Sequence, residues 1–206
     1  MENILLVLAL SLDAFVASIA YGSNKIKIPF LSLVIINIVC SSFLASAMFF
    51  GSQIKKVLPE SITLTLSFAI FFLLGIYYLL ESIIKSYLKK RFDTSEKVRI
   101  KLFDIWLIID IYVDGTKADI NKSKILDSKE ALYLAVALSL DSLAVGFGSS
   151  LGNINYLHVI ALSLVVGIIS IWSGIFLGKK IVEKTNINLS WLSGIMLIIL
   201  GILKLI

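Results

Sequence analysis

Six long apolar runs divide this chain and constrain its fold more than any other feature. Each has about 20 residues, the length of an α-helix that crosses the ~30 Å hydrocarbon core of a bilayer. With 58% hydrophobic and only 16% charged residues, the chain could not cover so much apolar surface as a soluble domain. We therefore predict an all-α, polytopic membrane protein with six transmembrane helices, at residues 3–22, 30–53, 62–84, 130–151, 157–178 and 188–206.

The basic residues predict how the spans are oriented. If the N-terminus lies outside the cell, the three cytoplasmic loops hold 2, 11 and 3 Lys or Arg residues, which is 16 of the 19 in the chain. Lys and Arg are enriched in the cytoplasmic loops of membrane proteins. We therefore expect a protein integral to the cell (inner) membrane, with both termini outside and the long loop in the cytoplasm. Within that loop, the apolar segment 103–112 is too short to span, and it lies along the inner membrane surface or packs under the helices.

The second half of the chain repeats the first. The sequence ALSLD stands at residues 9–13 and again at 137–141, an offset of 128, and residues 67–80 align with residues 193–206 at an offset of 126. Similar offsets over several segments indicate an internal repeat, and repeats of three spans must enter the bilayer from opposite sides. We therefore predict two inverted three-helix repeats, at 1–84 and 130–206, separated by a cytoplasmic loop at 85–129.

Asp13 and Asp141 are the residues on which the functional hypothesis depends. Each lies about 11 residues, or ~16 Å, into its predicted helix, which is near the bilayer midplane. A carboxylate is costly at this depth, so a functional role is the first hypothesis. Carboxylate oxygens suit Mg²⁺, Ca²⁺ or Mn²⁺, and Ser11 and Ser139 would orient the two carboxylates or add oxygen ligands. The alternative is a pair of protonated Asp residues bonded to neighbouring helices.

Small residues on the spans predict close packing of the helices. Ala9 and Ala17 share a helix face with Asp13, which indicates that this carboxylate points at a neighbouring helix rather than at lipid. In the fifth span, Gly174 and Gly178 form a Gly-x-x-x-Gly pattern, which is typical of plain helix packing. The polar residues of the second span either bond to other helices or line a pathway: Asn37, Ser41, Ser42 and Ser46.

The residues around both Asp motifs resemble those of a known family. Residues 11–18 read SLDAFVAS and residues 139–146 read SLDSLAVG, and these doubled motifs are similar to those of the manganese efflux pump (MntP) family. In the third span, Gly75 followed by Glu81 also matches. The resemblance implies a six-helix exporter with two three-helix repeats, in which Asp13 and Asp141 bind the metal or couple to an ion. Glu81 is a further candidate metal residue, at the inner opening of the pathway. The alternative is that its side chain extends toward the membrane surface or pairs with Lys85.

Two departures from this family pattern point to one of its branches. The family's efflux pumps carry an acidic residue in the second helix, at the position where this sequence has Cys40. The long loop is the second departure. Together the two features are similar to the sporulation membrane protein (YtaF) branch, for which the resemblance implies no particular ion.

The end of the long loop has the ligand spacing of a calcium-binding EF-hand. Positions 1, 3, 5, 7, 9 and 12 of such a 12-residue loop supply oxygens, and here they are Asp119, Asn121, Ser123, Ile125 (through its carbonyl), Asp127 and Glu130. Position 6, where Gly makes a sharp turn, is Lys124. This lysine strains the turn and adds a positive charge, so we expect weak binding of Ca²⁺ or Mn²⁺. The alternative is an acidic turn in which Asp127 and Glu130 cap the fourth span.

The sequence carries no pattern that indicates an enzyme. It has no Gly-rich phosphate loop, Ser-His-Asp set or His-x-x-Glu-His motif, so we expect neither catalysis nor a prosthetic group. Basic residues beside apolar spans favour lipid over nucleic acid as a partner, and the oligomeric state is left open. We predict a secondary transporter that exports a divalent cation such as Mn²⁺ through a site near the midplane. The alternative is a non-transporting sporulation membrane protein that keeps the transporter fold as a scaffold or sensor.

Overall fold

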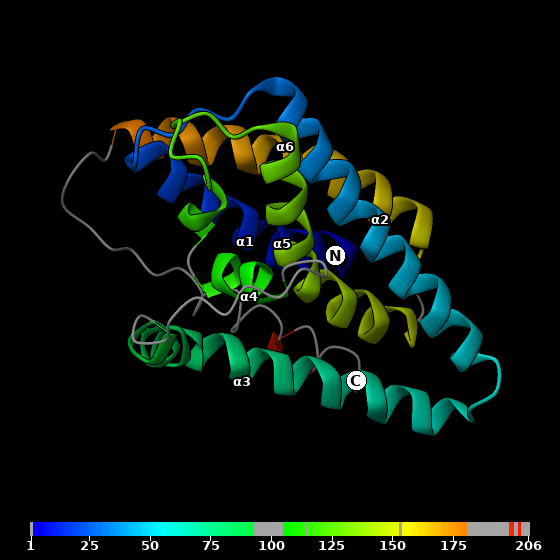
Figure 1. The fold of residues 1–206 in the computed structure, drawn as a ribbon. Coiled ribbons are helices and arrows are strands. Elements are labelled where there is room, and N and C mark those ends of the chain that lie inside the picture. The colour runs from blue at the N-terminus through cyan, green and yellow to red at the C-terminus, as the bar shows by residue number, and fades with distance from the viewer. Residues whose placement is uncertain are drawn as a thin grey trace.

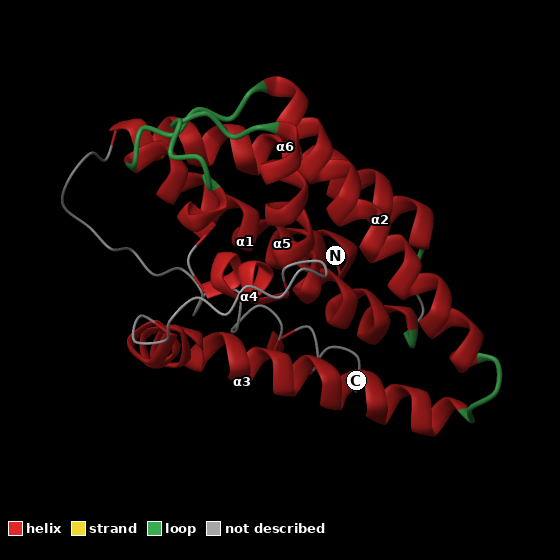
Figure 2. Cartoon of the chain, in the orientation of Figure 1, coloured by secondary structure: helices red, strands yellow, loops and turns green. Residues whose placement is uncertain are grey.

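The computed structural model describes residues 2–92, 105–113, 115–152 and 154–180, together with Ile198, Ile199 and Ile202. These residues form helices joined by turns and short loops, with an isolated bridge between Lys27 and Ile125 (Figure 1, Figure 2). In chain order the helices are α1 (Glu2–Ser23), α2 (Phe30–Lys55), α3 (Glu60–Phe92), α4 (Ile105–Val113), the short 3-10 helix η1 (Gly115–Ala118), α5 (Ser128–Ser150) and α6 (Tyr156–Lys180).

Five of these helices are long and apolar enough to cross a membrane: α1, α2, α3 as far as Leu80, α5 and α6. They coincide with five of the six predicted spans, and the prediction of an all-helical, integral membrane protein is confirmed. The predicted sixth span, at 188–206, lies outside the described residues except for three isoleucines.

The segment predicted as a loop, 85–129, is partly helical. α3 continues to Phe92, past the predicted end at residue 84, because its sequence there contains no Gly or Pro that would end a helix. Farther along, α4 packs against α5, and its Ile111 is only 2% exposed within the protein core. Of the two alternatives for this apolar segment, packing against the other helices is the one observed.

The starts of three helices follow from their local sequence. Pro29 and Pro59 stand directly before α2 and α3, where a residue without an N–H is tolerated because the first N–H groups of a helix have no partner within it. α5 begins with a capping box, in which the Glu130 carboxylate accepts a hydrogen bond from the Asp127 N–H at 3.0 Å. That bond satisfies a backbone donor that the helix leaves unpaired.

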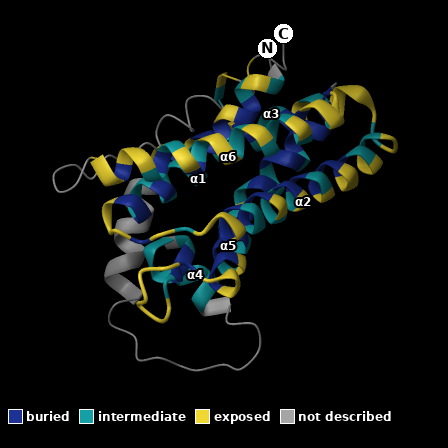
Figure 3. Ribbon diagram, turned by 90° about the horizontal axis from the view of Figure 1, so that it is seen from above, coloured by how far each residue is buried: buried dark blue, intermediate teal, exposed yellow. Residues whose placement is uncertain are grey.

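The outward faces of the long helices are apolar. Figure 3 shows exposed residues along α2 and α6, and large hydrophobic side chains such as Phe49, Phe50, Trp172 and Phe176 are among them. A surface of this kind is unfavourable in water but is solvated by lipid tails. This distribution agrees with the assignment of these helices to the membrane.

Small residues bring two pairs of helices into close contact. α1 packs against α6, where a Cβ built at Gly178 would come within 3.0 Å of the Gly22 Cα. α2 packs against α5, where Gly51 meets Ser150. The packing role predicted for Gly178 is therefore observed, and it depends on the absence of a side chain at the crossing.

Each of these interfaces has a second contact one turn earlier along the chain. A Cβ at Gly174 would stand 2.7 Å from the Ser18 Cβ, and a Cβ at Gly146 would stand 3.0 Å from the Ala47 Cβ. The order of the contacts shows that α1 runs in the same direction as α6, and that α2 runs in the same direction as α5. Because α1 and α2 run in roughly opposite directions (Figure 1), α5 runs roughly opposite to α1.

Candidate functional site

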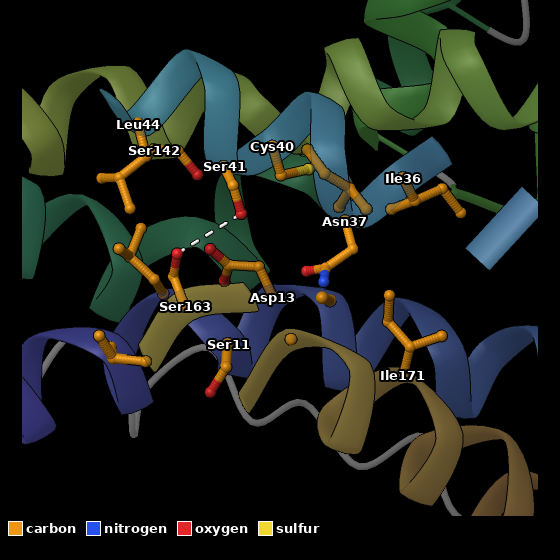
Figure 4. Close-up of a pocket in the computed structure, with 15 residues that line it drawn as sticks. Ser11, Asp13, Ile36, Asn37, Cys40, Ser41, Leu44, Ser142, Ser163 and Ile171 are labelled. Carbon is orange, nitrogen blue, oxygen red and sulfur yellow. Dashed lines mark hydrogen bonds between the residues drawn. The ribbon is translucent and has the colours of Figure 1, made fainter. Parts of the chain in front are cut away.

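A small cavity lies where α1, α2, α5 and α6 meet (Figure 4). It offers about 50 Å³ to the centres of water molecules, and one water needs only ~10–15 Å³ of such space. The cavity therefore has room for a few waters or for one ion. Apolar side chains form much of its wall, and its polar or titratable lining residues are Ser11, Asp13, Asn37, Cys40, Ser41, Ser142 and Ser163.

Asp13 supplies a carboxylate to this cavity. Figure 4 shows its side chain directed between Ser41 and Ser163, whose hydroxyl oxygens lie 3.4 Å apart. The Tyr78 hydroxyl of α3 donates a hydrogen bond to Asp13 Oδ2 at 2.8 Å. Asp13 therefore faces the neighbouring helices, as the small residues on its side of α1 predicted.

The polar residues of α2 divide between the two roles left open by the sequence. Asn37 does both: it lines the cavity, and its Nδ2 donates a hydrogen bond to the Leu164 carbonyl of α6 at 2.7 Å. Gly167 gives the Asn37 side chain its space, because a Cβ at Gly167 would overlap with Asn37 Oδ1. Ser42 and Ser46 are exposed and donate to carbonyls of their own helix. Of the polar residues of α2, those that line the cavity are therefore the candidates for the site.

Asp141 of α5 lies close to the hydroxyl that Asp13 binds. Tyr78 donates to Asp13, and the Asp141 carboxylate lies near the same hydroxyl. On its other side, Asp141 Oδ1 accepts a hydrogen bond from the Tyr112 hydroxyl of α4 at 3.4 Å, and the Tyr112 and Tyr77 oxygens lie 2.5 Å apart. Two carboxylates that stand 128 positions apart in the sequence thus lie close to one hydroxyl.

Sequence reasoning did not include the tyrosines among the site residues. Tyr77 and Tyr78 lie in the third predicted span, and Tyr112 lies in the apolar loop segment. A signal was available, because a tyrosine hydroxyl that is buried among apolar side chains needs a hydrogen-bond partner. The sequence did not indicate which partners these hydroxyls would find.

Ser11 and Ser139 make equivalent hydrogen bonds within their own helices. The Ser11 hydroxyl donates to the Leu8 carbonyl at 2.9 Å, and the Ser139 hydroxyl donates to the Val136 carbonyl at 2.8 Å. In this arrangement each serine proton is donated to a backbone carbonyl. Each serine oxygen keeps lone pairs that a metal ion could use. Their roles as metal ligands stay predictions. Glu81 belongs to α3, but its side chain lies outside the described residues.

The EF-hand-like segment folds as a turn that bonds to its own backbone. Asp119 accepts hydrogen bonds from the N–H groups of Ser123 and Lys124, each at 3.0 Å. Glu130, which is 5% exposed, accepts bonds from the N–H groups of Ile120 and Asn121 as well as from its cap partner. In the structure, the acidic turn therefore has the arrangement of the capping alternative, in which Asp127 and Glu130 cap α5.

The backbone of this turn also bears on metal binding. Lys124 adopts a φ of 60° at the position where a calcium loop uses glycine. Within the part of the chain that the structure describes, no three His, Cys, Asp or Glu side chains converge as metal ligands. Metal binding by the loop residues stays a prediction.

Two apolar clusters lie on either side of the two aspartates. Along α1, Leu6 belongs to one cluster and Tyr21 to the other, with Asp13 between them. Along α5, Val145 belongs to the first cluster and Ala137 to the second, with Asp141 between them. The carboxylates therefore form a polar layer that apolar packing closes on both sides.

Comparison with known sequences assigns the chain to a family. The sequence model of the Mntp family, described as "Putative manganese efflux pump", matches residues 58–205. The chain belongs to the Mntp family. This confirms the predicted family, and the matched residues include the second Asp motif at 139–146.

Relatives within the Mntp family cover the whole chain. The "Probable sporulation protein YtaF" of Bacillus subtilis is 31% identical over 98% of this chain and 97% of its own length. The "Putative manganese efflux pump MntP" of Aliarcobacter butzleri is 26% identical over 98% of this chain and 97% of its own length. These similarities confirm the predicted branch as well as the family. No solved structure matches the chain.

Proposed function

We propose that the chain is a secondary transporter that exports a divalent cation, Mn²⁺, through a site formed by Asp13 and Asp141. The observation that carries the proposal is the position of Asp13, which lines a cavity with polar residues, binds the Tyr78 hydroxyl and lies near Asp141 beside that hydroxyl. Ionisable residues within membrane helices mark ion pathways. The description of the Mntp family and the name of its relative in A. butzleri support Mn²⁺ as the ion.

The donor groups around the cavity suit this ion. Asp13 lines the cavity, and Asp141 lies near Asp13 but is not among the residues that line it. Together the two carboxylates would balance the charge of one Mn²⁺, and the oxygens of Asn37, Ser41 and Ser163 would add neutral donors from α2 and α6. Oxygen ligands of this kind favour Mn²⁺ and Mg²⁺, whereas thiolate and imidazole ligands favour Zn²⁺ or Cu²⁺. A cation arriving between the carboxylates would take over the compensation that the tyrosine hydroxyls provide.

We propose that the chain is built from six spans arranged as two inverted three-helix repeats. Support comes from contacts that correspond under the sequence offsets of 127 and 128. Gly178 against Gly22 corresponds to Gly51 against Ser150, and the contacts one turn earlier correspond in the same way. The opposite directions of α1 and α5 agree with the inverted arrangement. The sixth span, at 188–206, completes the second repeat in this proposal.

Transport by such a site needs access from one side of the membrane at a time. The apolar clusters on the two sides of Asp13 and Asp141 would act as the two barriers, each opening as one repeat moves against the other. The excess of basic residues in the proposed inner loops favours both termini outside and the long loop in the cytoplasm. Export then means loading from the side on which the long loop lies.

A second candidate function is a scaffold or sensor in sporulation that does not transport. Its support is the similarity to the B. subtilis relative, whose name refers to sporulation and not to an ion. Cys40 also stands where the resemblance expects an acidic residue, and its thiol donates to the Ala135 carbonyl at 3.6 Å. The two candidates differ in whether the gene changes the metal content of the cell.

Cellular metal content separates the candidates. We expect cells that express the chain in a manganese-sensitive host to contain less Mn and to tolerate more external Mn²⁺ than cells with an empty vector. The control is the same chain with Asp13→Asn at a matched protein level. Equal Mn content in all three strains would contradict the transport proposal and favour the scaffold.

A further inference from the structure

The long loop reaches the candidate site through one side chain. Tyr112 belongs to α4, which lies between the two proposed repeats in sequence and is part of neither. Its hydroxyl nevertheless donates to Asp141 Oδ1 at 3.4 Å. Figure 1 shows α4 between α5 and α3, where it can face both. The loop therefore contributes to a site that the membrane spans otherwise form.

The position of Tyr112 is fixed by contacts on both sides of it along the chain. Its neighbour Ile111 is buried in the same apolar cluster as Ile36 and Leu134. After α4 ends, the Gly115 carbonyl accepts a hydrogen bond from the Tyr21 hydroxyl of α1. These anchors on α1, α2 and α5 hold α4 against the bundle.

The hydrogen bonds give Tyr112 a defined direction. A tyrosine hydroxyl has one proton to donate, and that of Tyr112 points at Asp141. The Tyr112 oxygen can then accept the proton of Tyr77, whose oxygen is 2.5 Å away. In this arrangement the Tyr77 hydroxyl of α3 donates to Tyr112 of α4, and the Tyr112 hydroxyl donates to the Asp141 carboxylate.

We infer that Tyr112 is a positioning residue for Asp141, through which the long loop sets the affinity of the site. This inference rests on the proposed transport function. Asp13 accepts a hydrogen bond from Tyr78 of a membrane span, whereas Asp141 accepts one from Tyr112 of the loop. A change in the docking of α4 would therefore act directly on the orientation of Asp141.

A transport measurement tests the consequence for the ion. In proteoliposomes, Tyr112→Phe should raise the KM for Mn²⁺ by about three- to tenfold, the factor that one net hydrogen bond supplies, while the maximal rate stays within about twofold. Tyr77→Phe should act in the same direction and less strongly. The control is Tyr133→Phe, which removes a hydroxyl eight residues before Asp141 on α5, about 12 Å along the helix, and should leave KM unchanged. An unchanged KM in Tyr112→Phe would overturn the inference.

A chemical measurement tests the positioning without relying on transport. In the purified full-length chain with Asp13→Asn, Asp141 is the carboxylate left at the pair, and a fluorescent carbodiimide reports its accessibility. Adding Tyr112→Phe should increase labelling of Asp141, located by peptide mapping, about threefold or more because one covering hydroxyl is lost. Adding Tyr133→Phe instead should not. Equal labelling of all three variants would overturn the inference. Increased labelling in a protein that moves no Mn²⁺ would support the positioning and contradict only the transport.

Discussion

Two ionised carboxylates that lie close together repel each other, because like charges interact strongly where water is excluded. Asp13 binds the Tyr78 hydroxyl, and Asp141 lies near the same hydroxyl. In the proposed site, a divalent cation between the two carboxylates would offset that repulsion and balance both charges. At the scale of residues, the proposal therefore depends on the closeness of Asp13 and Asp141.

Lys124 provides a test of the acidic turn at the same scale. It occupies a left-handed backbone conformation, with a φ of 60°, which costs a residue other than glycine about 1–2 kcal/mol. Lys124→Gly would remove that cost and a positive charge from the centre of the predicted metal loop. We expect the full-length protein in detergent to bind Ca²⁺ or Mn²⁺ at the turn about tenfold more tightly after this change, measured by calorimetry.

Lys122 supplies the matched control for this change. It also has a positive φ, of 54°, so Lys122→Gly relieves the same kind of strain and removes the same charge. It does not stand at the position where a calcium loop requires glycine. If Lys124→Gly and Lys122→Gly bind metal equally, or if neither binds it, the turn acts only as the cap of α5.

At the scale of elements, the docking of η1 on α1 can be fixed by a disulfide. A Cβ at Gly115 would lie 3.9 Å from the Ala17 Cβ, close to the ~3.8 Å mean of natural disulfides. With Cys40→Ser to remove the native thiol, Ala17→Cys and Gly115→Cys should cross-link under mild oxidation. Mass spectrometry of the linked peptides is the measurement. Failure to link, where both single variants react with a maleimide, would place η1 elsewhere.

The crossing of α1 and α6 leaves no room for a side chain at Gly178. A Cβ there would come within 3.0 Å of the Gly22 Cα and closer still to the Ile19 carbonyl, and backbone atoms cannot move aside cheaply. Gly178→Ala should therefore destabilise the protein by about 1–3 kcal/mol, seen as a lower unfolding temperature in detergent. The control is Gly115→Ala, whose Cβ would meet only ordinary contacts at 3.9 Å. Equal unfolding temperatures would refute the tight crossing.

At the scale of the whole molecule, the spans were predictable because hydropathy records which residues face lipid. Five predicted spans match helices to within a few residues at most ends. The length of α3 was not predicted, since hydropathy marks where a membrane span ends, whereas the helix continues through a polar sequence to Phe92. Contacts between small residues such as Gly178 and its partner helix were also indicated by spacing.

Only the carboxylates of the candidate site could be predicted from the sequence. Asp13 and Asp141 stood out because charge is rare in apolar spans. Tyr78 and Tyr112 could not be assigned, since they meet the carboxylates across 65 and 29 positions of chain and only through tertiary packing. The roles of Asn37 and Ser41 depended in the same way on which side of α2 faces the cavity. Patterns along one helix do not contain that information.

The central proposal is that two carboxylates from two repeats hold one ion. Mn²⁺ efflux from cells that express variants at matched levels tests it most directly. Asp13→Asn and Asp141→Asn keep the side-chain size and should each reduce efflux by about 100-fold or more, because a lost ligand costs at least as much as a lost supporting contact. The double variant should be no worse than either single one, since losses within one site do not add. Glu60→Gln, at an exposed carboxylate at the start of α3, is the control and should transport normally. Full efflux in either single variant would contradict the account.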